Sequence, residues 1–340
     1  MLSHRNMVYN VAQSIHWQGE AYDGVEPLVA ITALPLYHIF SLQGNCLLGM
    51  AQGGLNVLIT NPRDMPGFVK EISKFKFNLL TGVNTMFASL LNTPGFSDID
   101  FSALRVVVGG GMAVQPAVAR EWAEVTGKPI VQGYGLTESS PAAICNTIEG
   151  EFTGSIGLPI PSTEVMIVGD DGNELPIGEI GEICLKGPQI MEGYWQRPAE
   201  TAEVMLPGGW LRTGDIGRMD EDGFTYIEDR KKDMILVSGF NVYPNEVENV
   251  VVEIEGILEA AAIGVPDERS GEIVKIFAVK TDPDVTDQDV IDYCRDNLTG
   301  YKRPKRIEFR DELPKTNVGK ILRRALREEE LSKLAASSSE

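Results

Sequence analysis

Short apolar runs alternate with amphipathic segments over the first part of the chain. The runs are nearly continuous, as expected for parallel strands buried on both faces, and they lie at 28–34, 55–60, 77–81 and 104–108. Between them, apolar residues recur at helical spacing at about 40–50, 66–75, 84–91 and 115–126. This alternation predicts a mostly parallel sheet with helices on its faces.

Two further patterns follow along the chain. Between residues 150 and 230, short alternating runs are separated by turn signals at 170–173 and 220–223, which indicates an antiparallel, barrel-like section. Beyond it, strand-like runs mix with helical patterns at 244–253, 285–297 and 319–331. We therefore predict an α/β protein with a large domain at 1–230, a small α+β domain at 231–332 and a disordered tail at 333–340.

The composition limits the classes of function. A chain of 340 residues with 43% hydrophobic residues can bury two cores, and its net charge of −19 does not favour nucleic acid. The four cysteines are far apart and form no C-x-x-C pair, which argues against a zinc site or a disulfide framework. No apolar run reaches the roughly eighteen residues of a membrane span. A reducing cytoplasm is the simplest compartment.

Two glycine-rich segments follow predicted strands. The segment GGG at 109–111 would let a ligand approach the backbone closely, although a tight turn explains it equally well. In GYGLTE at 133–138, Tyr134 offers a flat face for a base and Thr137 a hydroxyl for a phosphate. Glu138 offers a hard oxygen ligand for Mg²⁺. The alternative is a Gly-Tyr-Gly turn with a capping threonine.

Other residues allow a chemical role, but each has a simpler explanation when taken alone. Asp215 follows a glycine turn and could accept hydrogen bonds from ribose hydroxyls, as aspartates do in nucleotide sites. The charged cluster at 229–233 is a solvated linker or a hinge, and Gly239 would let a thin ligand pass. Lys320 lies on a flexible loop and could neutralise charge that develops during nucleotidyl transfer. His38 lies in apolar surroundings, where a core histidine is commoner than a catalyst.

In their order and spacing, these segments resemble the acyl-adenylate-forming superfamily, which includes acyl-CoA synthetases, luciferase and peptide-synthetase adenylation domains. The chain looks most like a bacterial long-chain fatty-acid–CoA ligase. That likeness rests on MLSHRN at 1–6, ALPLYHIF at 33–40, TGVNT at 81–85, GWLRTGD at 209–215 and the run at 229–246. One departure is Arg212, where histidine is common in the fatty-acyl ligase signature.

The resemblance implies a two-step reaction and roles for residues late in the chain. A fatty acid attacks the α-phosphate of ATP to form acyl-AMP, and the thiol of CoA then displaces AMP. By motif match, Lys320 orients the carboxylate and the α-phosphate, while Asp215 and Arg230 hold the ribose hydroxyls. The small domain would act as a lid that rotates about Lys232 between the steps, with Gly239 beside the pantetheine arm.

The resemblance also assigns residues of the large domain. The adenine of ATP or AMP is expected against Gly110, Gly111, Gly133 and Tyr134. Thr137 would contact phosphate, Glu138 would bind Mg²⁺, and His38 would lie near the acyl carboxylate. Segments 40–48 and 81–87 should line the acyl pocket.

Members of this superfamily carry a Ser/Thr/Gly-rich phosphate loop just before the MLSHRN segment. We therefore expect only part of the large adenylation domain here, with an exposed apolar edge and a need for a missing N-terminal fragment. Three functions stay open: a ligase that is inactive as this chain alone, a remnant that binds AMP or CoA, and a ligase for aryl or short acids. Peripheral membrane contact also stays open, because a fatty acid partitions into bilayers.

Overall fold

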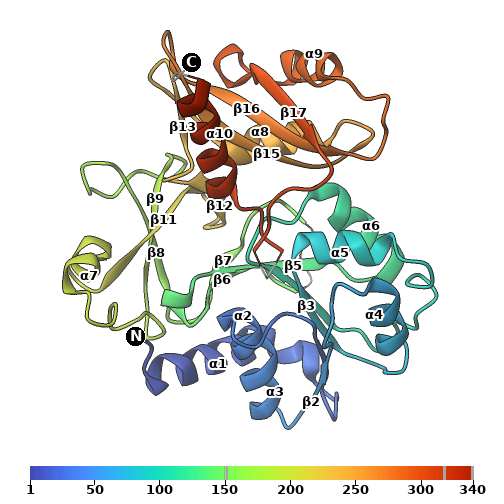
Figure 1. Ribbon diagram of the computed structural model, residues 1–340. Coiled ribbons are helices and arrows are strands. Elements are labelled where there is room, and N and C mark those ends of the chain that lie inside the picture. Colours follow the sequence, from blue (N-terminus) through green and yellow to red (C-terminus); the bar gives the residue numbers. More distant parts are fainter. Residues whose placement is uncertain (149, 151, 317–318, 338–340) are drawn as a thin grey trace. The chain divides into compact units, whose positions relative to one another are not determined.

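The computed structural model describes residues 1–148, 150, 152–316 and 319–337, and they form two compact units (Figure 1). The first unit comprises Met1–Thr213 and Gly217–Ile227, and the second comprises Gly214–Ile216 and Glu228–Glu340. We expected the boundary after residue 230, so Asp215 and Arg230 move from the first part to the second. A hydrogen bond of 2.9 Å from the Lys231 amide to the Gly214 carbonyl oxygen joins these two segments.

The first unit is built on a seven-stranded sheet in the order β2-β1-β3-β4-β5-β6-β7. Its first five strands pair in parallel, as predicted, and β6 and β7 extend the sheet antiparallel. The strands are β1 (Val29–Thr32), β2 (Leu55–Leu58), β3 (Leu79–Gly82), β4 (Val106–Gly110), β5 (Ile130–Gly135), β6 (Ala142–Cys145) and β7 (Leu158–Pro159).

Helices cover both faces of this sheet. On one face, Phe68 of α4, Phe87 of α5 and Trp122 of α6 form the centre of an aromatic-rich core, and the ring centroids of Phe87 and Trp122 are 4.8 Å apart. On the other face, Leu48 of α3 packs against the strands. The helices are α1 (His4–Gln18), α2 (Ile39–Ser41), α3 (Leu48–Ala51), α4 (Met65–Ile72), α5 (Asn84–Leu91) and α6 (Pro116–Thr126).

The helix predicted at 40–50 contains a turn with i→i+5 hydrogen bonds in place of i→i+4. Leu42–Leu47 forms a π-helical turn between α2 and α3. Such turns occur mostly as single bulges inside helices. Within it, Asn45 is buried and accepts a hydrogen bond of 2.7 Å from the Thr81 hydroxyl, so the turn is tied to the end of β3.

A second sheet of the first unit has the order β10-β11-β9-β8, with β12 paired to β11. The pairs β8–β9 and β10–β11 are antiparallel, in agreement with the pattern of residues 150–230. The elements are β8 (Glu164–Val168), β9 (Gly181–Lys186), α7 (Pro198–Val204), β10 (Met205–Leu206), β11 (Trp210–Met219) and β12 (Thr225–Arg230).

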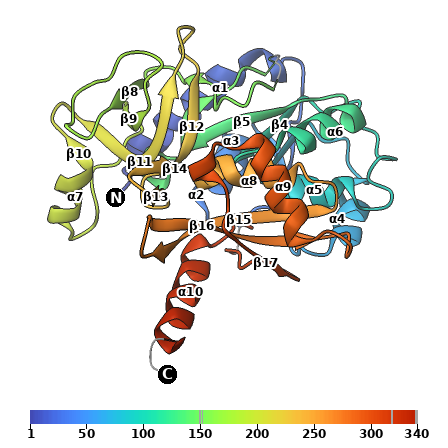
Figure 2. The ribbon, with the colours of Figure 1, turned by 90° about the horizontal axis from the view of Figure 1, so that it is seen from above.

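The second unit is a small α+β fold with the sheet order β14-β13-β16-β15 and β17 beside β16. Helices α8 and α9 pack on one face through Val247 and Val290, and α10 lies on the other face through Leu326 (Figure 2). The elements are β13 (Ile235–Val237), β14 (Phe240–Val242), α8 (Pro244–Val252), β15 (Ile257–Asp267), β16 (Gly271–Lys280), α9 (Asp287–Asn297), β17 (Arg306–Arg310) and α10 (Arg323–Ser337).

Two expectations about α10 were wrong. The helix begins at Arg323 rather than at residue 319, because residues 315 and 321 form a β-bridge that holds the preceding loop. Residues 333–337 are helical, although we expected a disordered tail; residues 338–340 lie outside the described part. Lys333 pairs with Glu329 at 2.9 Å and with Glu330 at 3.0 Å, which stabilises this last stretch.

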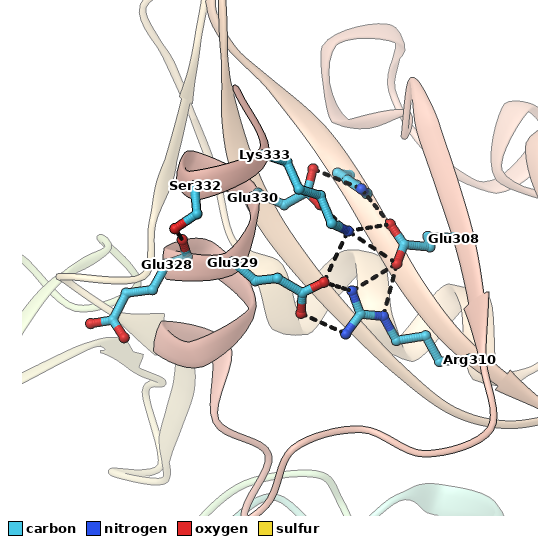
Figure 3. Close-up of polar contacts among 8 residues, drawn as sticks. Glu308, Arg310, Glu328, Glu329, Glu330, Ser332 and Lys333 are labelled. Atoms are coloured by element: carbon cyan, nitrogen blue, oxygen red, sulfur yellow. Dashed lines mark hydrogen bonds and ion pairs between the residues drawn. The ribbon is translucent and has the colours of Figure 1, made fainter. Parts of the chain in front are cut away.

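Ion pairs join α10 to the sheet of its unit (Figure 3). Lys275 of β16 is buried, and its Nζ lies 2.7 Å from carboxylate oxygens of both Glu308 and Glu330. Arg310 of β17 lies 2.6 Å from Glu329. Because these charges neutralise one another beside buried strands, α10 is held by a charge network as well as by apolar contact.

Candidate functional site

The two glycine segments lie side by side at the carboxyl ends of β4 and β5. Gly110 is the register partner of Gly133. A Cβ atom at Gly110 would lie 3.1 Å from the Phe40 ring and 3.2 Å from the Gly133 carbonyl oxygen, so a larger residue would crowd this edge. Gly111 has a φ of 76°, which favours glycine. The structure therefore brings together Gly110, Gly111 and Gly133, which lie in two separate glycine segments of the sequence.

Two amide side chains support this glycine edge: Gln132, which no sequence motif singled out, and Asn84, which was expected only within the segment that lines the acyl pocket. The Gln132 Oε1 accepts a hydrogen bond of 3.0 Å from the Val114 amide, and its Nε2 donates to the Ser155 carbonyl oxygen at 2.9 Å. Asn84 accepts from the Gln115 amide at 2.9 Å. These bonds hold the loop that follows Gly111. The signal in the sequence was weak, since each is a single polar residue beside an apolar run.

Tyr134 is 9% exposed and belongs to the apolar cluster of Ile144, Ile190 and Leu211. Most of its ring is therefore covered by protein, more than we expected for an open adenine platform. Its backbone is held as well, because a Cβ atom on the next residue, Gly135, would lie 1.7 Å from the Pro141 carbonyl oxygen. This close contact between Gly135 and Pro141 fixes the position of the end of β5 relative to the 3₁₀ turn that follows it.

Thr137 and Glu138 lie on that turn, which spans Thr137–Ser139. Thr137 is exposed and Glu138 is half-buried. The Tyr194 hydroxyl donates a hydrogen bond of 2.9 Å to Glu138 Oε1, and the Met191 amide donates to the Glu138 carbonyl oxygen at 2.8 Å. Burial, together with the nearby Glu138 carboxylate, raises the pKa of Tyr194 to about 12, so the phenol stays a donor. Tyr194 was missed because 56 residues separate it from its partner.

His38 caps the N-terminus of α2. Its Nδ1 accepts a hydrogen bond of 3.3 Å from the Phe40 amide, and the side chain is half-buried. This cap starts the helix whose first residues stand over the glycine edge through Phe40. His38 thus caps α2, the helix that places the Phe40 ring next to Gly110.

In the second unit, the structure brings together Asp215, Arg230 and Lys320. Arg230 Nε lies 3.4 Å from Asp215 Oδ1, and the Asp215 side chain is buried. Burial lowers the pKa of Lys320, the positive charge of Arg230 lowers it further, and Asp215 acts in the opposite direction. Three residues from three separate motifs thus form one electrostatic group.

The loop that carries Lys320 is closed by its own backbone. The Thr316 amide donates to the Lys320 carbonyl oxygen at 2.7 Å, and the Lys320 amide donates to the Thr316 hydroxyl at 3.1 Å. Gly319 has a φ of 82°, which explains the glycine at the turn. Asn317 and Val318 of the same loop lie outside the described residues.

Lys232 and Gly239 lie on exposed turns of the second unit. Lys232 follows β12, five residues after the chain leaves the first unit at Ile227. Gly239 forms the tip of the β13–β14 hairpin with Ser238, at φ values of 84° and 52°. A Cβ atom at Gly239 would meet nothing within 4 Å, so its glycine is required by the backbone angle and not by crowding inside this chain.

Two family models match the chain. One described as "AMP-binding enzyme" matches residues 1–195, and one described as "AMP-binding enzyme C-terminal domain" matches residues 246–320. The chain belongs to the AMP-binding enzyme family. The family predicted from the motifs is thereby confirmed.

Relatives of the chain include proteins named long-chain-fatty-acid--CoA ligase. The one from Escherichia coli O6:H1 is 57% identical over 335 residues, which cover 98% of this chain and 59% of the relative. The one from Bacillus subtilis is 42% identical over 333 residues, covering 97% of this chain and 59% of the relative. The chain thus spans about three fifths of the length of these relatives.

Solved structures of similar fold include enzymes with bound nucleotides. ATP-bound MatB from Rhodopseudomonas palustris matches with a TM-score of 0.88 and 30% identity, over 97% of this chain and 64% of that one. The anthranilate CoA ligase AuaEII in complex with anthranoyl-AMP matches with a TM-score of 0.87 and 30% identity, over 99% and 65% of the two chains. The predicted α/β fold class is confirmed by these likenesses.

Proposed function

We propose that the protein serves ATP-dependent activation of a long-chain fatty acid and its transfer to CoA. In the first step, a carboxylate oxygen attacks the α-phosphorus of ATP, the bond to the β-phosphate oxygen breaks, and pyrophosphate leaves. In the second step, the CoA thiol attacks the acyl carbonyl, loses its proton and displaces AMP. The name and 57% identity of the Escherichia coli relative carry this proposal.

The second unit would supply the charge balance of the first step. Positioning and electrostatic stabilisation dominate phosphoryl and nucleotidyl displacements. The Lys320 ammonium would hold the attacking carboxylate beside the α-phosphate, and its group with Asp215 and Arg230 supports that role. Asp215 would accept hydrogen bonds from the ribose hydroxyls, and Arg230 would donate to the same sugar.

The first unit would hold the base and the phosphates. Glycines at 110, 111 and 133 place no side chain at this edge, so a flat base would approach the backbone here, next to Tyr134 on the same strand as Gly133. Thr137 would donate to phosphate. The ATP-bound and anthranoyl-AMP-bound neighbours support a nucleotide here.

Magnesium fits the carboxylate of Glu138. This cation is usually held by one or two carboxylates together with substrate phosphates and water. One Glu138 oxygen is oriented by Tyr194, and the half-buried carboxylate offers a hard oxygen donor. When bound, Mg²⁺ would neutralise phosphate charge.

His38 would lie near the acyl carboxylate.

We propose that the acyl substrate is a long-chain fatty acid and not an aryl acid. Residues 40–48 and 81–87 would line the pocket, and the bond between Thr81 and Asn45 joins these segments. A feruloyl-CoA synthase from an Amycolatopsis species is 38% identical over 330 residues, well below the 57% of the fatty-acid relative. A panel of aryl, short and long acids separates the two classes of substrate.

The remaining roles concern motion and partners. Lys232 would be the hinge between the steps, and Gly239 would leave room for the pantetheine arm.

Leu55 and Leu58 on the edge strand β2 are exposed, which suits cover by a further polypeptide segment such as the part of the relatives outside the matched region. No helix among the described residues is long and apolar enough to cross a membrane; peripheral association with a bilayer would follow from the substrate.

The proposal is tested by following palmitoyl-AMP and palmitoyl-CoA after adding palmitate, ATP, Mg²⁺ and CoA. The chain is assayed alone and with the part of the Escherichia coli relative outside the matched region. Product that is lost in Lys320→Ala supports the proposal. Absence of both products under both conditions, or a preference for aryl acids, overturns it.

A further inference from the structure

Arg323 lies three residues after Lys320 and is the first residue of α10. Its guanidinium is largely buried and meets Glu248 of α8 in a bidentate pair, with Nε–Oε1 at 2.7 Å and Nη2–Oε2 at 2.6 Å. Paired parallel bonds of this kind fix orientation as well as distance. The same Nη2 also donates to Asn245 Oδ1.

The other side of the guanidinium faces the segment that follows β12. Arg323 Nη1 lies 3.6 Å from Asp229 and 3.6 Å from Asp233. Asp229 is buried and accepts hydrogen bonds from the amides of Arg230 at 2.6 Å and Asn245 at 2.7 Å. Arg323 therefore stands between α8 and the residue directly before Arg230.

This placement connects two parts of the proposed site. Through Arg323, the Lys320 loop is fixed at its C-terminal end to Asp229, and Asp229 holds the amide of Arg230. Arg230 in turn pairs with Asp215. The two segments are about ninety positions apart in the sequence, so their relative placement depends on such contacts.

We propose that Arg323 is a positioning residue that holds the Lys320 loop and the Arg230–Asp215 pair in one arrangement for adenylate formation. The proposal rests on the function proposed above. A merely structural network would lose stability when Arg323 alone is replaced, because its carboxylate partners stay behind without the cation. A positioning role would in addition change the reaction of the folded variant, because the direction of two functional side chains depends on Arg323.

The neighbouring Arg324 provides a matched control. Its side chain is 86% exposed and pairs with Glu328 one turn along the same helix. We compare Arg323→Met, Arg323→Lys and Arg324→Met with the wild-type chain of 340 residues. Lysine keeps the charge but cannot form the paired bonds.

The first measurement does not depend on activity. Labelling of Lys320 with an amine-reactive reagent over a pH series, read by mass spectrometry, gives the apparent pKa of this amine. We expect Arg323→Met to raise this pKa toward the usual lysine value, because burial and the Arg230 charge no longer act at close range. Arg323→Lys should lie between, and Arg324→Met should match the wild type. An unchanged titration in folded Arg323→Met overturns the proposal.

The second measurement is palmitoyl-AMP formation. We expect Arg323→Met to lower kcat about tenfold or more with little change in KM for palmitate, as misplacement of reacting groups does. If Arg323→Met does not fold, the test rests on Arg323→Lys. A Lys320 pKa and a kcat in Arg323→Lys that both equal the wild-type values overturn the proposal. A wild-type chain that forms no palmitoyl-AMP under any condition contradicts the proposed function, whereas the Lys320 titration still decides the role of Arg323.

Discussion

The Tyr194 hydroxyl donates a hydrogen bond of 2.9 Å to Glu138 Oε1. Tyr194 lies in the segment after β9 of the second sheet, and Glu138 lies on the turn after β5 of the first sheet. The bond occupies one oxygen of the carboxylate that we propose for Mg²⁺. A ligand that is held in this way loses less freedom when it binds a cation.

We therefore expect Tyr194→Phe to weaken the response to magnesium. The Mg²⁺ concentration for half-maximal palmitoyl-AMP formation should rise about tenfold, in line with the usual effect of removing a partner of a metal ligand. Tyr226→Phe is the matched control, because Tyr226 also donates to a carboxylate, that of Asp220 at 3.1 Å, on a turn outside the proposed site. Identical magnesium curves for Tyr194→Phe and the wild type would contradict the role of this bond.

Gly135→Ala should destabilise the first unit strongly. The new methyl group would lie 1.7 Å from the Pro141 carbonyl oxygen, and backbone atoms cannot move aside cheaply. We expect a loss of about 3 kcal/mol or more in the free energy of unfolding, measured in urea. Gly133→Ala is the steric control, since its Cβ atom would meet Val108 at an ordinary 3.6 Å. Equal stability of both variants would show that the β5 end adapts.

Lys275→Met should loosen α10 from its sheet. The substitution leaves Glu330 buried without one of its cationic partners, Lys275, which costs about 3 kcal/mol in such pairs. The double variant Lys275→Met/Glu330→Leu should recover part of the loss. Lys76→Met is the control, because its pair with Asp100 is exposed at the surface, and its unfolding curve should match the wild type. A wild-type curve for Lys275→Met would exclude a structural role for the network.

Asp229 should make stability depend on pH in an unusual direction. Burial raises the pKa of Asp229 to about 6, although Arg323 and two amide donors oppose this. Since the folded chain then binds a proton more tightly than the unfolded chain, the contribution of Asp229 is greatest at acid pH. It is lost as the pH rises through about 6.

The pH effect is isolated by comparing the wild type with Asp229→Asn in urea at several pH values. The difference in unfolding free energy, wild type minus variant, should fall between about pH 4 and pH 6.5. Most carboxylates in ion pairs act the other way; Glu329, for example, has a pKa lowered to about 2 by Arg310 and Lys333. A difference that is constant with pH would mean that folding does not shift the pKa of Asp229.

The sequence by itself determined the family, the fold class and most of the elements. Apolar periodicity reports which faces are buried, and glycine positions report backbone angles, because both are local properties. The helix at Asn84–Leu91 was predicted with its observed bounds, and the strand runs were placed to within a few residues. The prediction of a disordered tail from residue 333 was wrong for residues 333–337: despite their polar composition they continue α10, where Lys333 pairs with Glu329.

Only the tertiary structure decided which separate residues meet. The pair of Asp215 and Arg230, the nearby Lys320, and the contact of Tyr194 with Glu138 each join segments with no common local pattern. Their distances depend on how strands and helices pack, and an ion pair between such segments leaves no periodic signal. The same holds for Arg323, whose charged neighbourhood reads as a solvated helix until packing buries it against Glu248 and Asp229.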